Sequence, residues 1–482
     1  MRIPAVRPVL LAVVVASAAC TQRTPEQQLV YDAAEALGGQ ARIDAVGVLT
    51  VEGTGTQYNL GQDMRPGLAD QTFTVSAFKR EVEASGARMR TTQTRTPNFA
   101  YFQGPQAQTQ VQGVDGDVAY NVGASGTPAR ASAAAAGDRR NERFHHPLVL
   151  LRAALAPNAE VSAVRMDGVQ RVADVTTDVG TFTMVVGADN RLVRIESPGT
   201  HINLGDVVLT TTFSDYADAG GLQLPTRMAT KVDDFTTGTY QVKNTTASTG
   251  AVEAPAEAKS AAVPAAVAPN VAVEEVAPGV WFLAGQSHHS VVVAFKDRLV
   301  MIEAPQSEAR SLAAIASAKA LRPGTPLTHL VMSHHHFDHS TGMRAAIAEG
   351  LTIVTQAGNE AFVKEMAARP FTRTPDTLAK APKPPTTVAV GDTHTITDGA
   401  RELQLYHVNG NPHSDTMLMA YLPRERLLIE VDAFSPGGTY HPYAANLLGH
   451  VERLKLRVER IIPLHGTIQP FSALQAAAKA AS

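Results

Sequence analysis

Histidine and aspartate crowd together in one short segment of the chain, residues 334–339, whose sequence is His-His-His-Phe-Asp-His. The segment directly follows an apolar stretch, residues 327–333, that predicts a β-strand. Neutral imidazole nitrogens and carboxylate oxygens are good ligands for a borderline divalent metal ion. On a tight loop, the first and third histidines can converge on one ion while the aspartate and the last histidine face a second. Because the chain has only 16 histidines in 482 residues, an ordinary surface loop is a poor explanation of this cluster.

Further candidate ligands follow three later strand patterns. His413 comes soon after the alternating apolar stretch 403–408. Asp432 and His465 each end a short apolar stretch of their own. In α/β proteins, the side chains that do chemistry gather just beyond strand ends. These three residues are therefore candidate partners of the cluster at 334–339.

Taken together, these motifs resemble those of the metallo-β-lactamase superfamily of binuclear metallohydrolases, over residues 273–482. The resemblance implies two metal ions and divides the candidate ligands between them. One ion would be held by His334, His336 and His413, and the other by Asp338, His339 and His465. Asp432 lies where the family has a carboxylate that bridges both ions.

The implied site has only nitrogen and oxygen ligands, because the one cysteine, Cys20, is far from it in the sequence. Two Zn²⁺ ions suit these ligands, and Fe or Mn would also be accepted. Two ions about 3.5–4 Å apart can share a water and lower its pKa, so that a bridging hydroxide attacks a polarised acyl carbonyl. Asp338, the expected catalytic residue, would orient this nucleophile and accept its proton besides ligating a metal.

Each metal-bound imidazole should donate its other N–H to an acceptor. Glu303, at the end of an early strand pattern, and Asp415 are candidates for this role. Many relatives carry aspartate where this chain has Glu303, a departure that concerns this outer role and not the ligand set. For Asp415, a cap of its own loop is an equally good interpretation.

The expected function is hydrolysis of an acyl bond in a small molecule: an ester, lactone, thioester or amide. Few residues follow His465, which argues against the hydroxyacylglutathione hydrolases with their additional helical domain. Dedicated β-lactamases usually have cysteine or serine where this chain has Asp432. Lactonases stay open, as do exported metallohydrolases with a Pro-His-Ser/Thr-Asp run, which residues 412–415 resemble.

Two alternatives belong to other functional classes. The first is an iron-containing oxidoreductase on the same scaffold. The di-iron branch typically has glutamate in place of a histidine of the first motif, so the intact His334 and His336 disfavour it. The second is a non-enzymatic lipoprotein of the cell envelope that binds an apolar ligand, which the complete set of metal ligands disfavours.

Other polar residues receive more modest interpretations. His335 is predicted to point away from the metals. His288 and His289 are predicted to lie on a solvent-exposed hairpin, and the resemblance leaves contact with the substrate as the alternative. His145 and His146 are expected on the surface, before a short helix at 147–155. Near the mouth of the site, the candidates are Tyr440, His441, Tyr443 and the segment 371–385, which has no readable motif.

Alternating strand and helix patterns predict an α/β fold for residues 273–482, and the resemblance specifies an αββα sandwich. Residues 21–244 are predicted to form a mainly antiparallel β domain with a few helices, beginning with a capped helix at 24–37. Its pattern is similar to the curved sheet of lipoprotein-localisation (LolA-like) carriers. Residues 125–138 are predicted to form a mobile loop. The Ala- and Pro-rich stretch 245–272 is predicted to be an extended linker.

The first 20 residues resemble a bacterial secretion signal. The apolar run 9–19 is too short for a bilayer, which takes about 20 residues. Residues 17–20 resemble a lipoprotein cleavage box, so attachment of lipid to Cys20 is favoured over ordinary cleavage just before it. The protein is therefore expected in the periplasm, or anchored to a bacterial membrane. A net charge of −3 without a large basic cluster argues against nucleic acid as a partner, and the oligomeric state is left open.

Overall fold

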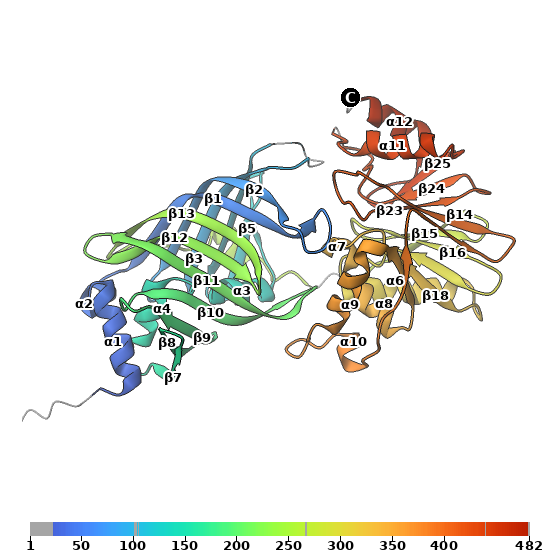
Figure 1. The fold of residues 1–482 in the computed structure, drawn as a ribbon. Coiled ribbons are helices and arrows are strands. Elements are labelled where there is room, and N and C mark those ends of the chain that lie inside the picture. The colour runs from blue at the N-terminus through green and yellow to red at the C-terminus, as the bar shows by residue number, and fades with distance from the viewer. Residues whose placement is uncertain (1–22, 101–103, 105, 266–267, 439, 481–482) are drawn as a thin grey trace, which may run out of the picture.

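The computed structural model describes residues 23–100, 104, 106–265, 268–438 and 440–480. Figure 1 shows two bodies, a sheet-rich N-terminal domain and a layered C-terminal domain. The predicted secretion signal, with Cys20, lies outside the described residues. Within the described part of the chain, each helix is too short or too polar to cross a lipid bilayer.

One antiparallel sheet of thirteen strands dominates the first domain and confirms the predicted β-rich fold. The chain forms two meanders. The first strand of the first meander pairs with the last strand of the second in the middle of the sheet, where Val48 lies opposite Ala247. The strands are β1 (Val48–Asp63), β2 (Asp70–Glu83), β3 (Arg88–Pro97), β4 (Gln108–Asp115), β5 (Val118–Val122), β6 (Pro128–Arg130), β7 (Glu160–Asp167), β8 (Gln170–Thr177), β9 (Gly180–Val186), β10 (Leu192–His201), β11 (Gly205–Asp218), β12 (Gln223–Val232) and β13 (Phe235–Ala247).

Helices pack against this sheet around a hydrophobic core. The predicted N-terminal helix has the expected capping box, in which Thr24 and Gln27 each accept the main-chain N–H of the other. Its apolar side chains, such as Leu29 and Leu37, are buried against the strands. The helices of this domain are α1 (Pro25–Leu37), α2 (Gln40–Asp44), α3 (Ala133–Glu142) and α4 (Pro147–Ala154).

Two predictions for this domain are wrong. Residues 125–138 do not form a loop but contain β6 and the start of α3, because Ser132 caps a run of alanines that favour helix. His145 and His146 are buried rather than exposed, because they lead into α4 where it packs on the sheet. His145 bonds to Thr211 and Ser197 at 3.0 and 2.9 Å, and burial lowers the pKa of both histidines to about 3.

The segment after β13 packs against the first domain, which its composition did not predict. It contains α5 (Ala256–Ser260), and Ala254 and Ala258 are buried together with Tyr120 of β5. The Ala254 N–H also donates to Asp115 at 3.2 Å. The prolines of this segment are therefore compatible with a stretch of chain that is held on the sheet.

Two sheets form the middle of the second domain. The first has β14 (Ala272–Ala277), β15 (Val280–Ala284), β16 (Ser290–Ala294), β17 (Leu299–Ile302), β18 (Leu327–Val331), β19 (Thr352–Gln356) and β20 (Thr386–Val390). The second has β21 (Thr393–Thr397), β22 (Glu402–His407), β23 (Leu418–Leu422), β24 (Leu427–Glu430), β25 (Arg460–Pro463) and β26 (Gln469–Pro470). Buried side chains of both sheets, such as Val293 and Leu405, share one core.

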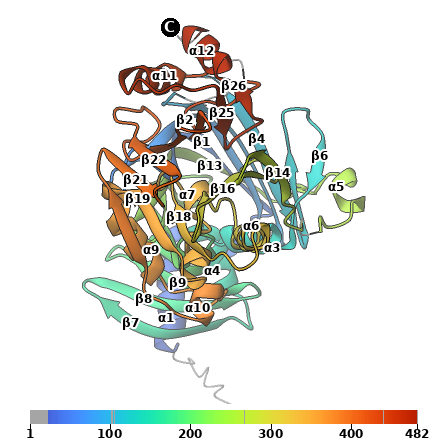
Figure 2. The ribbon, with the colours of Figure 1, turned by 90° about the vertical axis from the view of Figure 1, so that its right-hand side faces the viewer.

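Helices cover the outer face of each sheet and complete the four layers that an αββα sandwich requires. A second core lies between the first sheet and helices α6, α8 and α9, and a third between the second sheet and helices α11 and α12. Figures 1 and 2 show α11 and α12 together, well away from α9 and α10. The helices are α6 (Glu308–Leu321), α7 (Phe337–Ser340), α8 (Met343–Ala348), the 3₁₀-helix η1 (Ala357–Asn359), α9 (Glu360–Ala368), α10 (Thr377–Lys380), α11 (Ala444–Arg453) and α12 (Phe471–Ala480).

Two turns of the first sheet are among the parts of the first domain that contact the second domain. Leu204, in the β10–β11 turn, is fully buried in the core of the second domain, a burial that stabilises the contact by about 1.5–3 kcal/mol. Beside it, the Asp206 carboxylate accepts the main-chain N–H groups of Thr372 and Arg373 at 2.8 and 3.0 Å. The second turn, between β1 and β2, reaches α7, as Figure 1 shows.

Gly61, near the end of β1, lies directly against the ring of Phe337 in α7. A Cβ at Gly61 would lie 2.3 Å from that ring, whereas nothing lies within 4 Å of a Cβ at Gly67, in the same turn. Both glycines have a positive φ, 77° and 86°. The two positions therefore share a positive φ and differ in the space around them.

We expect Gly61→Ala to destabilise the protein more than Gly67→Ala. Both variants carry the backbone penalty of a positive φ, about 1–2 kcal/mol. Only the alanine at position 61 overlaps Phe337, which adds about 1–3 kcal/mol of overpacking. Thermal unfolding of the two variants should show a lower midpoint for Gly61→Ala. Equal midpoints would contradict the close contact of β1 with α7.

Candidate metal centre

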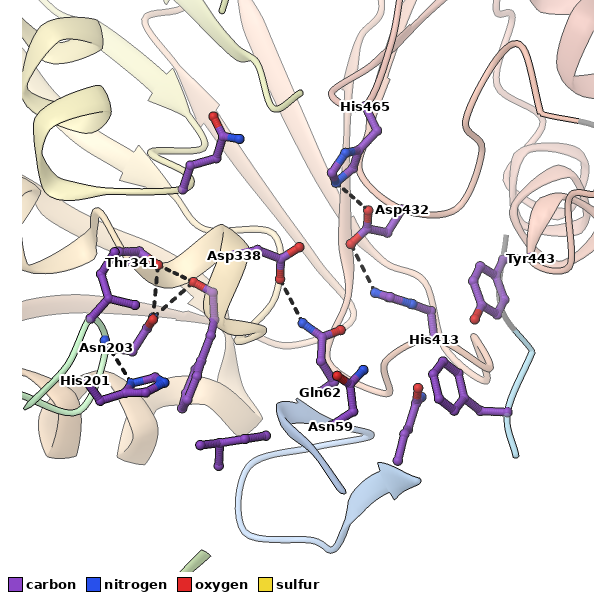
Figure 3. Close-up of a pocket in the computed structure, with 16 residues that line it drawn as sticks. Asn59, Gln62, His201, Asn203, Asp338, Thr341, His413, Asp432, Tyr443 and His465 are labelled. Carbon is purple, nitrogen blue, oxygen red and sulfur yellow. Dashed lines mark hydrogen bonds and ion pairs between the residues drawn. The ribbon is translucent and has the colours of Figure 1, made fainter. Parts of the chain in front are cut away.

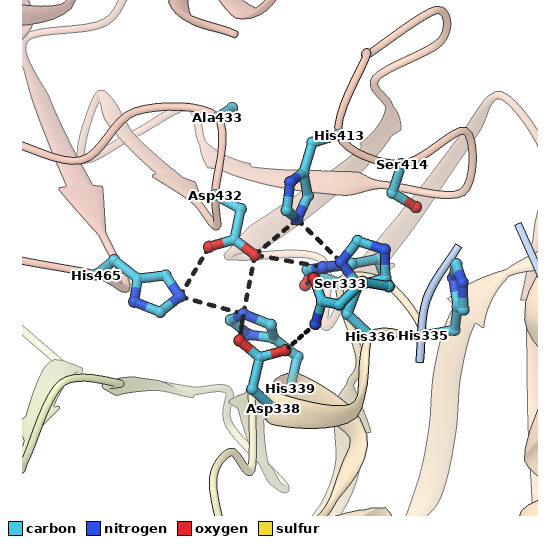
Figure 4. A network of polar contacts seen from close by, with 12 residues as sticks. Ser333, His335, His336, Asp338, His339, His413, Ser414, Asp432, Ala433 and His465 are labelled. Carbon is cyan, nitrogen blue, oxygen red and sulfur yellow. Dashed lines mark hydrogen bonds and ion pairs between the residues drawn. The ribbon is translucent and has the colours of Figure 1, made fainter. Parts of the chain in front are cut away.

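The seven side chains predicted as metal ligands come together in one cluster at the strand ends of the second domain (Figure 4). They follow strands of both sheets, so the distances between these side chains depend on how the two sheets pack. Their places are His334 and His336 after β18, Asp338 and His339 in α7, His413 before β23, Asp432 after β24, and His465 after β25.

The cluster consists of two groups of side chains, and each group could hold one metal ion. Within each group, the ligand atoms lie within 4.8 Å of one another. The first group is His334, His336, His413 and Asp432, and the second is His288, Asp338, His339 and His465. The division of six of these residues is the one expected from the sequence, which leaves Asp432 between the two ions and does not include His288.

Asp432 lies between the two groups. Its Oδ2 is 3.0 Å from His413 Nε2 and 2.9 Å from His339 Nε2, and its Oδ1 is 2.7 Å from His465 Nε2. The residue has a φ of 59°, a left-handed conformation that costs about 1–3 kcal/mol for a residue other than glycine. The carboxylate thus faces imidazoles of both groups, as a bridging ligand would.

Hydrogen bonds on the outer side of two imidazoles decide which ring nitrogen faces the cluster. His336 Nε2 donates to the main-chain oxygen of Asp63, and His339 Nδ1 donates to Glu303 Oε2, both at 2.9 Å. Carbonyl and carboxylate oxygens only accept, so the inner nitrogen of each neutral ring carries a lone pair. His334 Nε2 also faces inwards, buried and without a hydrogen bond. Imidazole nitrogens with a lone pair are ligand atoms that divalent cations accept.

The charges of the cluster favour a cation as well. Burial raises the pKa of Asp432, but His339, His465 and His413 outweigh burial and hold that pKa well below its ordinary value. Burial lowers the pKa of His339, but Asp432 and Asp338 raise it well above its ordinary value. Burial lowers the pKa of His334 to about 4, which leaves this imidazole neutral and able to bind a metal at pH 7.

Of the two predicted acceptors, Glu303 has the expected contact and Asp415 does not. Besides accepting from His339, Glu303 accepts the Ser333 N–H at 2.7 Å, so it holds both ends of the histidine-rich segment. Asp415 instead forms an ion pair with Arg65 of the first domain at 2.9 Å. Of the two interpretations of Asp415, the contact with a metal-bound imidazole is wrong, because the Asp415 carboxylate pairs with Arg65 instead.

His288 lies in the second ligand group, whereas the sequence predicts an exposed or substrate-contacting residue and not a ligand. It does not lie on an exposed hairpin, because its side chain is only 12% exposed. Its Nε2 lies 3.2 Å from Asp338 Oδ2, and its ring lies 4.0 Å from the ring of His465. The pair of histidines between two strand patterns was the signal that could have pointed to it.

The first domain also supplies contacts that no sequence pattern indicated. Gln62 Nε2 donates to Asp338 Oδ1 at 2.8 Å. Asp63 Oδ1 lies 2.7 Å from His335 Nε2. His335 points away from both ligand groups, as predicted, but it is buried and bonded rather than free. Residues more than 270 positions apart meet here, so local patterns carried no signal for these contacts.

A cavity of about 470 Å³ leads to the cluster and lies between the two domains (Figure 3). Of the sixteen described residues that line it, eight belong to the first domain, including Asn59, Gln62 and Asn203. Asp338, Asp432 and other candidate ligands form its floor. The first domain therefore contributes half of the surroundings of any small molecule bound there.

The residues predicted near the mouth of the site differ in whether they line the cavity. Tyr443 lines the cavity and its ring lies 5.2 Å from that of His413, but its hydroxyl donates to the main-chain oxygen of Ala100. Among the described lining residues, neither Tyr440, His441 nor any residue of 371–385 appears. The segment 371–385 instead begins on the first domain, where Phe371 packs against Gly205.

Comparison with known proteins gives structural matches only. No family model and no curated protein matches the chain. It is similar to the DIM-1 metallo-β-lactamase, with 16% identity over 44% of this chain and 97% of that one, at a TM-score of 0.36. A metallo-β-lactamase from Pontibacter korlensis matches with 18% identity over 44% and 99%, at a TM-score of 0.36. The mono-zinc form of FIM-1 from Pseudomonas aeruginosa matches with 15% identity over 44% and 94%, at a TM-score of 0.35.

Asp70 adds a pH-sensitive group to the turn that reaches the cluster. It lies opposite Asp63 where β1 and β2 pair, and its Oδ1 accepts the Gly61 N–H at 2.9 Å. Burial, followed by the charge of Asp63, raises its pKa from 3.8 to about 6. The folded chain therefore binds this proton more tightly than the unfolded chain does.

We expect ionisation of Asp70 to lower the free energy of unfolding as the pH rises from about 4 to about 6. Asp70→Asn keeps an acceptor for Gly61 and cannot ionise. At pH 7.5 it should melt about 2–4 °C above the unaltered chain, the effect of about 1 kcal/mol after solvent screening of a partly buried group. The difference should shrink towards pH 4.5 when both proteins are melted with a chelator. A difference that does not depend on pH would contradict the raised pKa.

Proposed function

We propose that this chain is a zinc-dependent metallohydrolase of the metallo-β-lactamase superfamily that hydrolyses an acyl bond in a small molecule. One observation carries the proposal: the Asp432 carboxylate lies within 3.0 Å of imidazole nitrogens from both ligand groups. A shared carboxylate between two groups of nitrogen ligands suits a pair of ions. Zn²⁺ is the first choice, although Fe and Mn accept the same ligands.

Two Zn²⁺ ions bound there would lower the pKa of a shared water and polarise the substrate carbonyl. Asp338 is the residue placed to orient the attacking water, because it faces the cavity and its side chain is 42% exposed. Gln62 and His288 each bond to one of its oxygens and so fix the plane of the carboxylate. His288 and His339 also outweigh burial and keep the pKa of Asp338 well below its ordinary value, so Asp338 is ionised at neutral pH.

The cavity suggests what the substrate carries besides its acyl bond. Amide side chains such as Asn59, Gln62 and Gln71 line it together with the aromatic rings of Phe99 and Phe337. Amides both donate and accept hydrogen bonds, so they complement neutral polar groups. We therefore propose an ester or lactone with a neutral polar group and an apolar part.

The place of the protein in the cell is part of the proposal. A secretion signal with a lipid on Cys20 would put the enzyme in the periplasm or on a bacterial membrane facing it, where it would take up its metal. The first domain, a curved antiparallel sheet with helices packed on it, supports the comparison with LolA-like carriers.

The test is hydrolysis of a panel of esters, lactones, thioesters and β-lactams, together with metal analysis. We expect two Zn²⁺ per chain, loss of activity with a chelator and recovery on adding Zn²⁺. Loss of an outer partner of a metal ligand costs about 10–100-fold, so Asp432→Asn should lose at least that much. His329→Gln, on β18 but outside the cluster, is the matched control and should stay active.

Two results would contradict the proposal. A protein with two bound metals that hydrolyses no member of the panel would not be a hydrolase of this kind. Bound iron together with oxygen consumption would instead support the oxidoreductase.

A further inference from the structure

The end of β1, in the first domain, reaches the metal centre of the second domain. Asp63 is the last residue of β1 and only 8% exposed. It contacts two consecutive residues of the histidine-rich segment, His335 and His336. Figure 4 shows the blue ribbon of the first domain beside His335.

The contact with His335 is made by the Asp63 carboxylate. His335 Nε2 lies 2.7 Å from Asp63 Oδ1, and His335 Nδ1 lies 3.1 Å from Thr416 Oγ1. Both ring nitrogens therefore have partners, one from each domain. Since His335 is 1% exposed and its ring packs 4.9 Å from that of His336, holding His335 also restricts its neighbour.

The contact with His336 is made by the Asp63 main chain. His336 Nε2 donates to the Asp63 carbonyl oxygen at 2.9 Å. A carbonyl oxygen only accepts, so Nε2 must carry the proton, and the neutral ring then has its lone pair on Nδ1. Nδ1 is the atom that faces His413 Nε2, at 3.0 Å. The tautomer that leaves Nδ1 free for a metal thus depends on a residue of the other domain.

The neighbours of Asp63 fix the turn in this position. Gln62 donates to Asp338, and Gly61 lies against Phe337. On the other side, the Met64 carbonyl accepts the Asp415 N–H at 2.7 Å. Successive residues of the turn thus contact the histidine-rich segment or the loop that carries His413, which leaves little freedom in the position of the Asp63 carbonyl.

We propose that Asp63 is a positioning residue for the metal centre: its carboxylate holds His335, and its carbonyl fixes Nδ1 of His336 as the ligand atom. This inference rests on the proposed function, because it assumes that the cluster binds metal. It makes the first domain a working part of the metal centre. Metal affinity should therefore depend on a side chain that does not itself ligate.

The experiment measures Zn²⁺ affinity of the full-length protein by competition with a chromophoric chelator. Asp63→Ala removes the hold on His335 and should weaken binding of one of the two ions by about 10–100-fold, the usual effect of losing an outer partner of a metal ligand. The matched control is Arg65→Ala, two residues further along the same turn. It removes an exposed ion pair with Asp415 across the same domain contact but touches no imidazole of the cluster. This variant should bind Zn²⁺ as tightly as the unaltered chain.

Equal affinities of Asp63→Ala and Arg65→Ala would overturn the inference. A second measurement does not depend on the folding of any variant: ¹⁵N shifts of the His336 ring in the metal-free, unaltered protein. We expect a protonated Nε2 and an unprotonated Nδ1, and the opposite tautomer would also overturn the inference. An unaltered chain that binds no Zn²⁺ would instead refute the proposed function.

Discussion

The buried carboxylate of Asp432 is the constraint on which the rest of the arrangement depends. It is only 2% exposed and is surrounded by imidazoles, so its charge requires a cation close by. The carboxylate stands just after β24, whereas His339 follows β18 of the other sheet. The ends of the two sheets must therefore meet, and the core between them holds the strained main chain of Asp432 in place.

The first domain extends this arrangement. Leu204 anchors one turn of its sheet in the core of the second domain, and the β1–β2 turn reaches the histidine-rich segment. Gln62 holds Asp338, which faces the cavity, and Asp63 holds the imidazoles of His335 and His336. The cavity is consequently shared between the domains. A change in how the domains pack would alter both the candidate ligands and the cavity.

The sequence was most informative where a pattern is local. The candidate ligands from His334 to His465 follow strand patterns, so their types and spacing predicted a cluster that the fold brings together. Alternation of apolar residues likewise predicted the antiparallel sheet. Patterns failed where tertiary contacts decide: Asp415 pairs with Arg65, and His145 is buried where the chain enters α4. Asp63 could not be found at all, because its partners lie in another domain.

Anomalous diffraction at the zinc edge, from crystals of the Zn²⁺-loaded full-length protein, tests the central claim most directly. The account predicts two peaks about 3.5–4 Å apart, one on each side of the Asp432 carboxylate. His334, His336 and His413 should surround one peak, and Asp338, His339 and His465 the other. A single peak, or peaks that leave Asp432 uncoordinated, would contradict a centre built around a shared carboxylate.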